Sequence, residues 1–203
     1  FFVGIQGTGR RVVDDGTQAF VNYAGQNGHK YKSYGRIMRE KGLLKQGDIP
    51  RISEVVDRQV IPYVNFRKMT SAAVGPQWRQ ASEAQREKLQ QAFKTMLIRT
   101  YAEALSQVRD QKLVVKPLRA APGDTDVLVR TEVHGRGEPV PLDFRLEKKP
   151  GEGWKIYNPT GVGIWMVETY RTQFAQELNQ GGIDGLIQAL SSRSFDATAA
   201  AKP

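Results

Sequence analysis

The spacing of apolar residues changes near the middle of the chain. Between residues 52 and 108, apolar side chains recur every three or four positions, which is the period of amphipathic helices. From about residue 127, apolar and polar residues alternate, which is typical of strands that bury one face. This order predicts an α+β domain in which helices come first and pack against a later sheet.

Three helices are predicted in the first half. Ser53 is expected to cap a helix through EVVDRQVI, and a second, short helix is expected over Phe66–Val74. Ser82 and Gln85 have the spacing of a capping box, which predicts that the longest helix begins there and covers about residues 83–108.

About four strands are predicted after the long helix. Residues 127–133 and 140–146 alternate apolar and polar positions, and the segments KLVVKPLRA and GWKIYN lie before and after them. Short turns that contain glycine and proline link these segments, which favours antiparallel neighbours. Because such a sheet has one dry face, we expect the helices to cover it.

The segment GVGIWMVETYRTQF is predicted to open a last amphipathic helix. Its apolar stripe runs through Val167, Tyr170 and Phe174, and a Gly181-Gly182 pair is expected to stop it. A short helix should follow over residues 184–191.

Ile164, Trp165 and Met166 carry apolar surface in the first turn of this helix beyond what its stripe can bury. With the dry sheet face and the wide stripe of the long helix, they offer more apolar surface than two packed layers use. The residues alone leave two interpretations open. The side chains pack as ordinary core, which is the more common use of Met and aromatic residues at helical spacing, or some of them line a cavity for an acyl chain.

Composition sets broad limits. The chain has 203 residues, of which 39% are hydrophobic, and no apolar run is long enough to span a bilayer. It contains no cysteine, which excludes disulfides, thiolate catalysis and Cys-based metal sites. The sequence begins at Phe1, which is compatible with removal of a signal peptide.

Charge is distributed unevenly. Residues 51–116 contain 12 Lys and Arg against 6 Asp and Glu, whereas residues 117–203 contain 10 against 11. A basic half attracts acidic partners, although a solvated helical face explains it equally well. On the long helix we expect Arg86, Lys88, Lys94 and Arg99 to lie on the outer surface. The interleaved aromatic and basic pattern of nucleic-acid stacking platforms is missing, so we expect no nucleic-acid partner.

Motifs for catalysis or metal binding are missing from the sequence. There is no nucleophile elbow, no zinc-protease motif and no P-loop. The two histidines, His29 and His134, are far apart on polar segments. Asp143 and Glu147 are expected to be solvated charges on the polar face of their strand. We therefore predict no enzyme, no cofactor and no metal site.

Long blocks of the sequence resemble a known family. GDIPRISEVVDRQVIPYVNFRKMTSAAVG, DFRLEKKPGEGWKIYNPTGVGIWMVETYRTQF and GIDGLIQAL are similar to the MlaC or toluene-tolerance family of periplasmic phospholipid-binding proteins. The resemblance runs from about Glu40 to Leu190. Asn158 stands where this family commonly has Asp.

The resemblance implies a fold and a function. The expected fold has helices packed on a curved, mainly antiparallel sheet of four to five strands, which together enclose an apolar cavity in a cone like that of nuclear transport factors. The expected protein is a monomeric periplasmic carrier, without enzymatic activity, that holds phospholipid by its acyl chains. Its partners would be an inner-membrane ABC transporter with an MCE-domain subunit and an outer-membrane lipoprotein-porin complex.

A nuclear-transport-factor-like enzyme or binding domain for a small apolar ligand is the alternative. Such an enzyme needs an ionisable group in the cavity, for which Tyr101, Tyr157 and Tyr170 are the candidates. We predict a single lipid-binding domain over residues 37–195, a preceding segment 1–36 of unassigned role and a disordered tail over 196–203. The predicted lipid-binding residues are Val56, Val60, Val64, Phe66, Met69, Val74, Phe93, Met96, Leu97, Tyr101, Val129, Val133, Leu142, Phe144, Ile156, Ile164, Trp165, Met166, Val167 and Tyr170.

Overall fold

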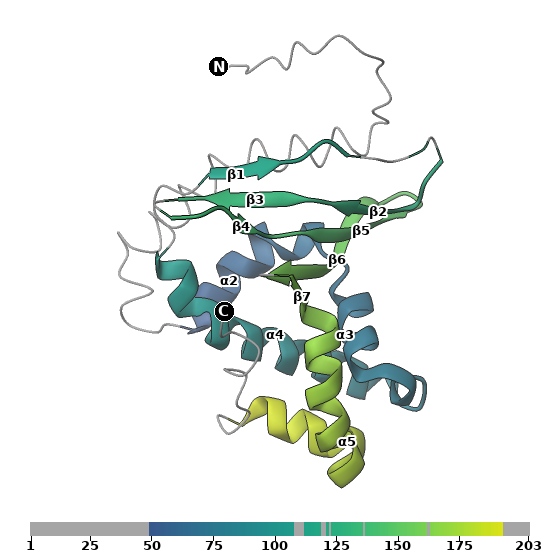
Figure 1. The fold of residues 1–203 in the computed structure, drawn as a ribbon. Coiled ribbons are helices and arrows are strands. Elements are labelled where there is room, and N and C mark those ends of the chain that lie inside the picture. Colours follow the sequence, from purple (N-terminus) through teal and green to yellow (C-terminus); the bar gives the residue numbers. More distant parts are fainter. Residues whose placement is uncertain are drawn as a thin grey trace.

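Helices lie together on one side of a curved antiparallel sheet (Figure 1). The computed structural model describes residues 49–107, 112–118, 121, 123–135, 137–161 and 163–192. In this part of the chain the predicted α+β class, with helices packed on a curved antiparallel sheet, is confirmed. The predictions for residues 1–36 and for the tail 196–203 lie outside the described residues.

The helices follow the predicted order. Their bounds are α2 Ile49–Gln59, the 3-10 helix η1 Ile61–Tyr63, α3 Phe66–Val74, the 3-10 helix η2 Gly75–Arg79, α4 Glu83–Gln107 and α5 Met166–Ser191. The predicted bounds of α3 are confirmed. The capping box is also confirmed, because the Ser82 amide donates to Gln85 Oε1 at 3.0 Å and the Gln85 amide donates to Ser82 Oγ at 3.2 Å. The prediction that Ser53 caps the first helix is wrong, since α2 already begins at Ile49.

Helix α5 contains the predicted glycine break. Gly182 has φ 61° and ψ −157°, a conformation that residues with a side chain rarely adopt. The segment after Gly182 continues as helix in a new direction and places Leu186 and Leu190, both fully buried, in the interior. The predicted stop is therefore a sharp turn between two helical segments.

Seven strands in the described residues form two ladders, ordered β1-β3-β4 and β2-β5-β6-β7. All of the pairings between these strands are antiparallel. Only Arg130 separates β2 from β3, and only Leu142 and Asp143 separate β4 from β5, so both ladders share two bent strands. The bounds are β1 Lys112–Val115, β2 Asp126–Val129, β3 Thr131–His134, β4 Val140–Pro141, β5 Phe144–Lys149, β6 Gly153–Gly161 and β7 Ile164–Trp165.

Asp143 holds the bend between the two ladders. Its carboxylate accepts a hydrogen bond from the Thr131 amide at 3.1 Å, and its own amide donates to Thr160 Oγ1 at 3.1 Å. The Thr160 amide donates to the Asp143 carbonyl at 2.8 Å. Thr131 and Thr160 are both buried. The expectation that Asp143 is a solvated charge is therefore wrong, because its carboxylate and backbone join three strands.

The helices meet the sheet mainly along β6 and β7. Helices α3 and α5 and the turn η1 pack on β6, and α5 also packs on β7. Val64 forms a parallel bridge with Ile156, and the Asn65 amide donates to the Ile156 carbonyl at 2.7 Å. The helix layer is therefore attached to the sheet along β6 and β7, at one side of the sheet.

Ile164 and Trp165 form β7 and precede α5. They pair with Gly161 and Thr160, and the helix begins only at Met166. The prediction that these two residues occupy the first helical turn is wrong. The short hairpin with β6 explains the difference, because it holds both residues in an extended conformation.

Candidate functional site

Most of the buried apolar side chains that the structure describes belong to one of two separate clusters. The first, which we call the helix core, joins α3, α4 and α5 and consists of Met69, Ala73, Val74, Leu89, Ala92, Phe93, Met96, Val167, Tyr170, Phe174, Leu178, Leu186 and Leu190. The second, which we call the sheet cluster, consists of Val127, Val129 and Leu146 on β2 and β5. The fully buried residues of the two layers thus do not merge into one cluster, although Val64 and Ile156, which are half-buried against the helix core and the sheet cluster respectively, pair with each other.

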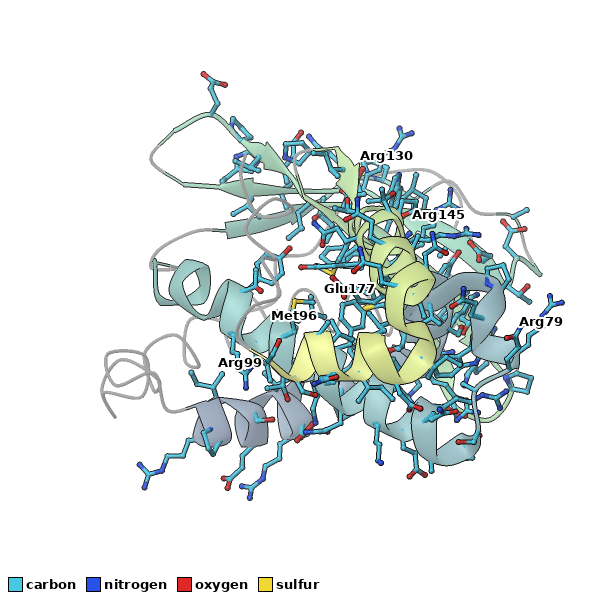
Figure 2. All side chains as sticks on the ribbon, turned by 90° about the horizontal axis from the view of Figure 1, so that it is seen from below. Arg79, Met96, Arg99, Arg130, Arg145 and Glu177 are labelled. Carbon is cyan, nitrogen blue, oxygen red and sulfur yellow. The ribbon has the colours of Figure 1, made fainter. Side chains whose placement is uncertain are left out.

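Phe93 is at the centre of the helix core. Its ring is fully buried and lies 5.1 Å, centroid to centroid, from both Tyr170 and Phe174, in edge-on geometry. A third ring, that of Phe66, lies 5.6 Å away. Met96, one turn further along α4, points into the interior between α4 and α5 (Figure 2). These side chains therefore have protein partners on several sides.

The predicted lipid-binding residues occupy five kinds of position. Met69, Val74, Phe93, Met96, Val167 and Tyr170 belong to the helix core, and Val64, Phe66, Leu97 and Met166 are half-buried against it. Val129 belongs to the sheet cluster, and Phe144 and Ile156 are half-buried against it. Val56, Val60, Tyr101, Val133, Leu142, Ile164 and Trp165 lie outside both clusters.

Among the predicted lipid-binding residues, those that are half-buried against a cluster keep exposed surface that a ligand could contact. Leu97 on α4 and Met166 on α5 each pack on the helix core with one side and keep part of their surface exposed. Phe144 and Ile156 do the same on the sheet cluster. The sequence predicted all four, but it could not separate them from fully buried neighbours in the same stripe.

Ile164 and Trp165 have surroundings that differ from those of Met166. The side chain of Ile164 is 55% exposed. The guanidinium carbon of Arg145 lies 5.1 Å from the centre of the Trp165 ring, in a cation-π arrangement. The three apolar residues that the sequence grouped together therefore have different surroundings: Ile164 faces solvent, Trp165 lies beside the Arg145 guanidinium, and Met166 packs on the helix core.

A polar network fastens α3 to the sheet. Glu147 on β5 accepts hydrogen bonds from the Asn65 side-chain amide and from Lys68 Nζ, the latter at 2.5 Å. Lys68 Nζ also lies 3.7 Å from the centre of the Tyr157 ring, and the Tyr157 hydroxyl donates to Asp126 at 2.6 Å. Sequence reasoning missed this network because its members are far apart in the chain.

Glu147 is an ion-pair partner and not a solvated charge, contrary to the sequence-based expectation. Burial alone would raise the pKa of its carboxyl group. The hydrogen bonds from Lys68 and Asn65, together with the positive charge of Lys68, outweigh burial and hold the pKa below its ordinary value. Glu147 therefore stays ionised and remains available to bind α3.

Asn158, the departure from the family pattern, caps helix α5. Its side chain is buried, and its Oδ1 accepts a hydrogen bond from the Val167 amide at 3.2 Å. Its Nδ2 donates to the Glu168 carboxylate at 2.9 Å. An amide fits here because it accepts from the helix and donates to the carboxylate, whereas a second carboxylate would repel Glu168.

Part of the predicted basic surface is engaged within the protein. Arg86 lies over the Trp78 ring at 5.5 Å and donates to the Trp78 carbonyl at 3.2 Å, and Lys94 pairs with Asp57 at 2.8 Å. Both side chains are only partly exposed, and their charges are engaged by partners within the protein. Lys88 and Arg99 are exposed, as predicted.

The described residues contain no cluster of three or more His, Asp or Glu that could hold a metal ion. Burial raises the pKa of the Tyr170 phenol above its ordinary value, so this hydroxyl stays neutral and does not act as a base. Of the helices that the structure describes, none combines the length and the apolar character needed to cross a bilayer.

Comparison with known proteins identifies a family model and relatives. A family model described as MlaC protein matches residues 31–192. The intermembrane phospholipid transport system binding protein MlaC of Haemophilus influenzae is 29% identical over 160 residues, which cover 77% of this chain and 74% of that protein. A toluene tolerance protein of Pseudomonas putida is 30% identical over 106 residues, covering 52% of this chain and 49% of the relative.

A solved structure matches over nearly the whole chain. It is a phospholipid-binding protein from Ralstonia solanacearum in complex with a phospholipid. The TM-score is 0.77 at 38% sequence identity, and the match covers 93% of this chain and 100% of that chain.

Proposed function

The chain belongs to the MlaC family, and from this membership we propose that it binds a diacyl phospholipid and carries it between two membranes. The observation that supports the proposal most directly is the separation of the helix core from the sheet cluster. The structural match to a protein solved with a phospholipid agrees with it.

The acyl chains would lie between the two apolar clusters. Leu97 and Met166 on the helix side, and Phe144 and Ile156 on the sheet side, are the half-buried residues that would contact them. The fully buried residues Phe93 and Val74 would support this wall from behind. No covalent chemistry is part of the proposal, because the cargo is bound and released unchanged.

The energetics of acyl-chain burial suit a carrier. Each methylene transferred from water to an apolar site contributes about 0.8 kcal/mol, so release of two long chains into water is negligible. A bilayer is as apolar as the binding site, so the same contribution nearly cancels when the lipid moves between them. Small differences in headgroup contacts then decide the direction of transfer, and a docked partner can supply them.

The proposed partners are those of the family resemblance: an inner-membrane ABC transporter with an MCE-domain subunit and an outer-membrane lipoprotein-porin complex, reached through the periplasm. Arg79 projects outward at the rim of the helix layer (Figure 2), and Arg99 on α4 is also exposed. Arg86 and Lys94 are paired within the protein, so the excess of basic residues would not act through these two side chains as direct contacts. It would act through the electrostatic field of the whole surface and raise the association rate with acidic partners.

The test is the lipid content of protein purified from a bacterial host without detergent. Native mass spectrometry and organic extraction should find about one diacyl phospholipid for each chain. Replacing Leu97 by Asp places a charge among the proposed chain contacts and should empty most of the protein. The matched control is Gln91→Asp, an exposed position two turns earlier on α4, which should keep its lipid. Trace lipid in the wild-type protein would contradict the proposal.

A further inference from the structure

Glu147 joins helix α3 to a strand that does not lie next to it. The residue is on β5, and β6 separates it from the start of α3. Val64 and Asn65, which precede α3, lie along β6, because Val64 bridges Ile156 and the Asn65 amide donates to the Ile156 carbonyl at 2.7 Å. The side chains of Asn65 and Lys68 therefore reach over β6 to the Glu147 carboxylate.

Several bonds hold this first turn of α3. The Lys68 ammonium lies 2.5 Å from the Glu147 carboxylate and 3.7 Å from the centre of the Tyr157 ring on β6. Asn65 caps the helix, since its Oδ1 accepts from the Lys68 amide at 3.0 Å while its side-chain nitrogen donates to Glu147. Side chains thus bond the start of α3 to two strands, and movement of α3 away from the sheet breaks these bonds.

This joint borders the space assigned above to the acyl chains. Val64 is half-buried against the helix core and Ile156 against the sheet cluster, and the two residues pair at the joint. Met69, one turn beyond Asn65, already belongs to the helix core. Helices α2 and α4 pack mainly on other helices, so the positions of α3 and α5 on the sheet set the distance between the two clusters.

The ion pair between Lys68 and Glu147 is shielded from water but lies outside both clusters. The Glu147 side chain is 19% exposed and that of Lys68 is 36% exposed, whereas Arg67 and Glu83, which pair within the helix layer, are 48% and 57% exposed. Water and salt screen a shielded pair less than an exposed pair. Since neither Glu147 nor Lys68 belongs to the helix core or the sheet cluster, their substitution leaves the proposed lipid contacts in place.

We propose that Glu147 and Lys68 are positioning residues for lipid exchange, because their ion pair holds α3 against the sheet and slows escape of the bound lipid when no partner is docked. This inference rests on the proposed phospholipid-binding function and adds an element to it. An acyl chain that leaves needs the two clusters to separate, and separation at this joint breaks the bonds to Glu147. Entry and escape pass through the same separated state, so the pair changes the rate of exchange and leaves the amount of lipid bound at equilibrium unchanged.

The experiment measures transfer of a labelled lipid to vesicles without any partner protein. The full chain is loaded with phosphatidylethanolamine that has one pyrene-labelled acyl chain and is mixed with an excess of phosphatidylcholine vesicles, and the fluorescence change gives the rate. Lys68→Met and Glu147→Gln should each transfer lipid about three- to tenfold faster than the wild type, as expected for loss of one part-exposed charged contact. The lipid per chain before mixing should be unchanged.

The two substitutions change the net charge in opposite directions, so an acceleration that they share is not an effect of net charge. The double variant should be no faster than the faster single variant, because both substitutions remove the same contact. Lys68→Arg is the conservative variant. It keeps the positive charge and can still lie over the Tyr157 ring, so it should transfer lipid at the wild-type rate.

Arg67→Met is the matched control. Arg67 precedes Lys68 on α3, and its ion pair with Glu83 on α4 joins two helices and not a helix to the sheet. The substitution removes the same charge as Lys68→Met. It should lower the melting temperature and leave the transfer rate unchanged.

Two outcomes would overturn the inference. If Lys68→Met and Glu147→Gln lose stability but transfer lipid at the wild-type rate, the pair stabilises the fold and has no role in exchange. If Arg67→Met accelerates transfer as much as Lys68→Met, the effect is a general loosening of α3. If the wild-type protein cannot be loaded with the labelled lipid, the proposed function itself fails, and the inference fails with it.

Discussion

Replacing Phe93 by Ala tests whether the helix core is protein packing or ligand wall. Phe93 is fully buried and contacts three aromatic rings at 5.1, 5.1 and 5.6 Å. A buried Phe→Ala substitution costs about 3–5 kcal/mol, and each lost ring pair adds about 0.5–1.5 kcal/mol beyond its buried area. We therefore expect a loss at the upper end, about 4–5 kcal/mol, which in a domain of this size lowers the melting temperature by about 8–20 °C.

The assay combines urea unfolding with lipid analysis of the folded fraction. Phe93→Ala should lose stability while the folded molecules keep about one lipid per chain. The control is Leu97→Ala on the next turn of α4, where the side chain is only half-buried and should cost less stability but more lipid. A double-mutant cycle with Phe174→Ala should give a coupling energy of about 0.5–1.5 kcal/mol. A stability loss below about 1 kcal/mol together with lost lipid would refute the assignment of Phe93 to the core.

Three further predictions concern local features. Glu147 has a pKa below its ordinary value of 4.5 in the folded protein, so its contribution to stability is present above that pH and is lost as pH falls through the folded pKa. Urea unfolding from pH 7 to pH 3 should therefore show a smaller acid loss for Glu147→Gln than for the wild type, whereas Glu152→Gln, at an exposed position, should follow the wild type. Gly182→Ala should lower stability by about 1–3 kcal/mol in thermal unfolding, because its φ is positive, whereas Gly181→Ala should change it little. Ser82→Ala should cost about 1 kcal/mol in the same measurement, since it removes one half of the capping box.

Features that depend on neighbours in sequence were predictable. The bounds of α3 and the capping box before α4 follow from residues within one turn of each other. The break at Gly182 follows from glycine alone, because few other residues tolerate its backbone conformation. These elements needed no knowledge of tertiary structure.

Features set by distant partners were not predictable. Glu147 sits on a strand whose pattern looks solvated, and its role depends on Lys68, which lies 79 positions earlier in the chain. Ile164 and Trp165 look helical in sequence, but pairing with Thr160 and Gly161 makes them a strand. Arg86 looks like a surface charge until Trp78 is placed beneath its guanidinium.

The candidate site was likewise predictable only in part, because distant residues decide which of its side chains are fully buried. Phe93 and Leu97 belong to one apolar stripe, and nothing in their spacing shows that one is fully buried and the other half exposed. That difference arises from α5, which covers Phe93 with Tyr170 and Phe174. The sequence therefore identified the apolar surface but could not assign its parts to packing or to binding.

The late position of α5 in the chain has a consequence for the order of folding. Helix α5 contributes one apolar face to the helix core, with residues spaced from Val167 to Leu190. In addition, the side chain of Gln85 at the start of α4 forms a hydrogen bond with Asp184, 99 positions later in the chain. Contacts at such separations form slowly, because the long intervening loop must close first. During synthesis, α3 and α4 can contact each other, but they lack the cover of α5 until almost the entire described chain has emerged. Phe93 therefore stays without the rings of Tyr170 and Phe174, which would bury it, throughout that interval.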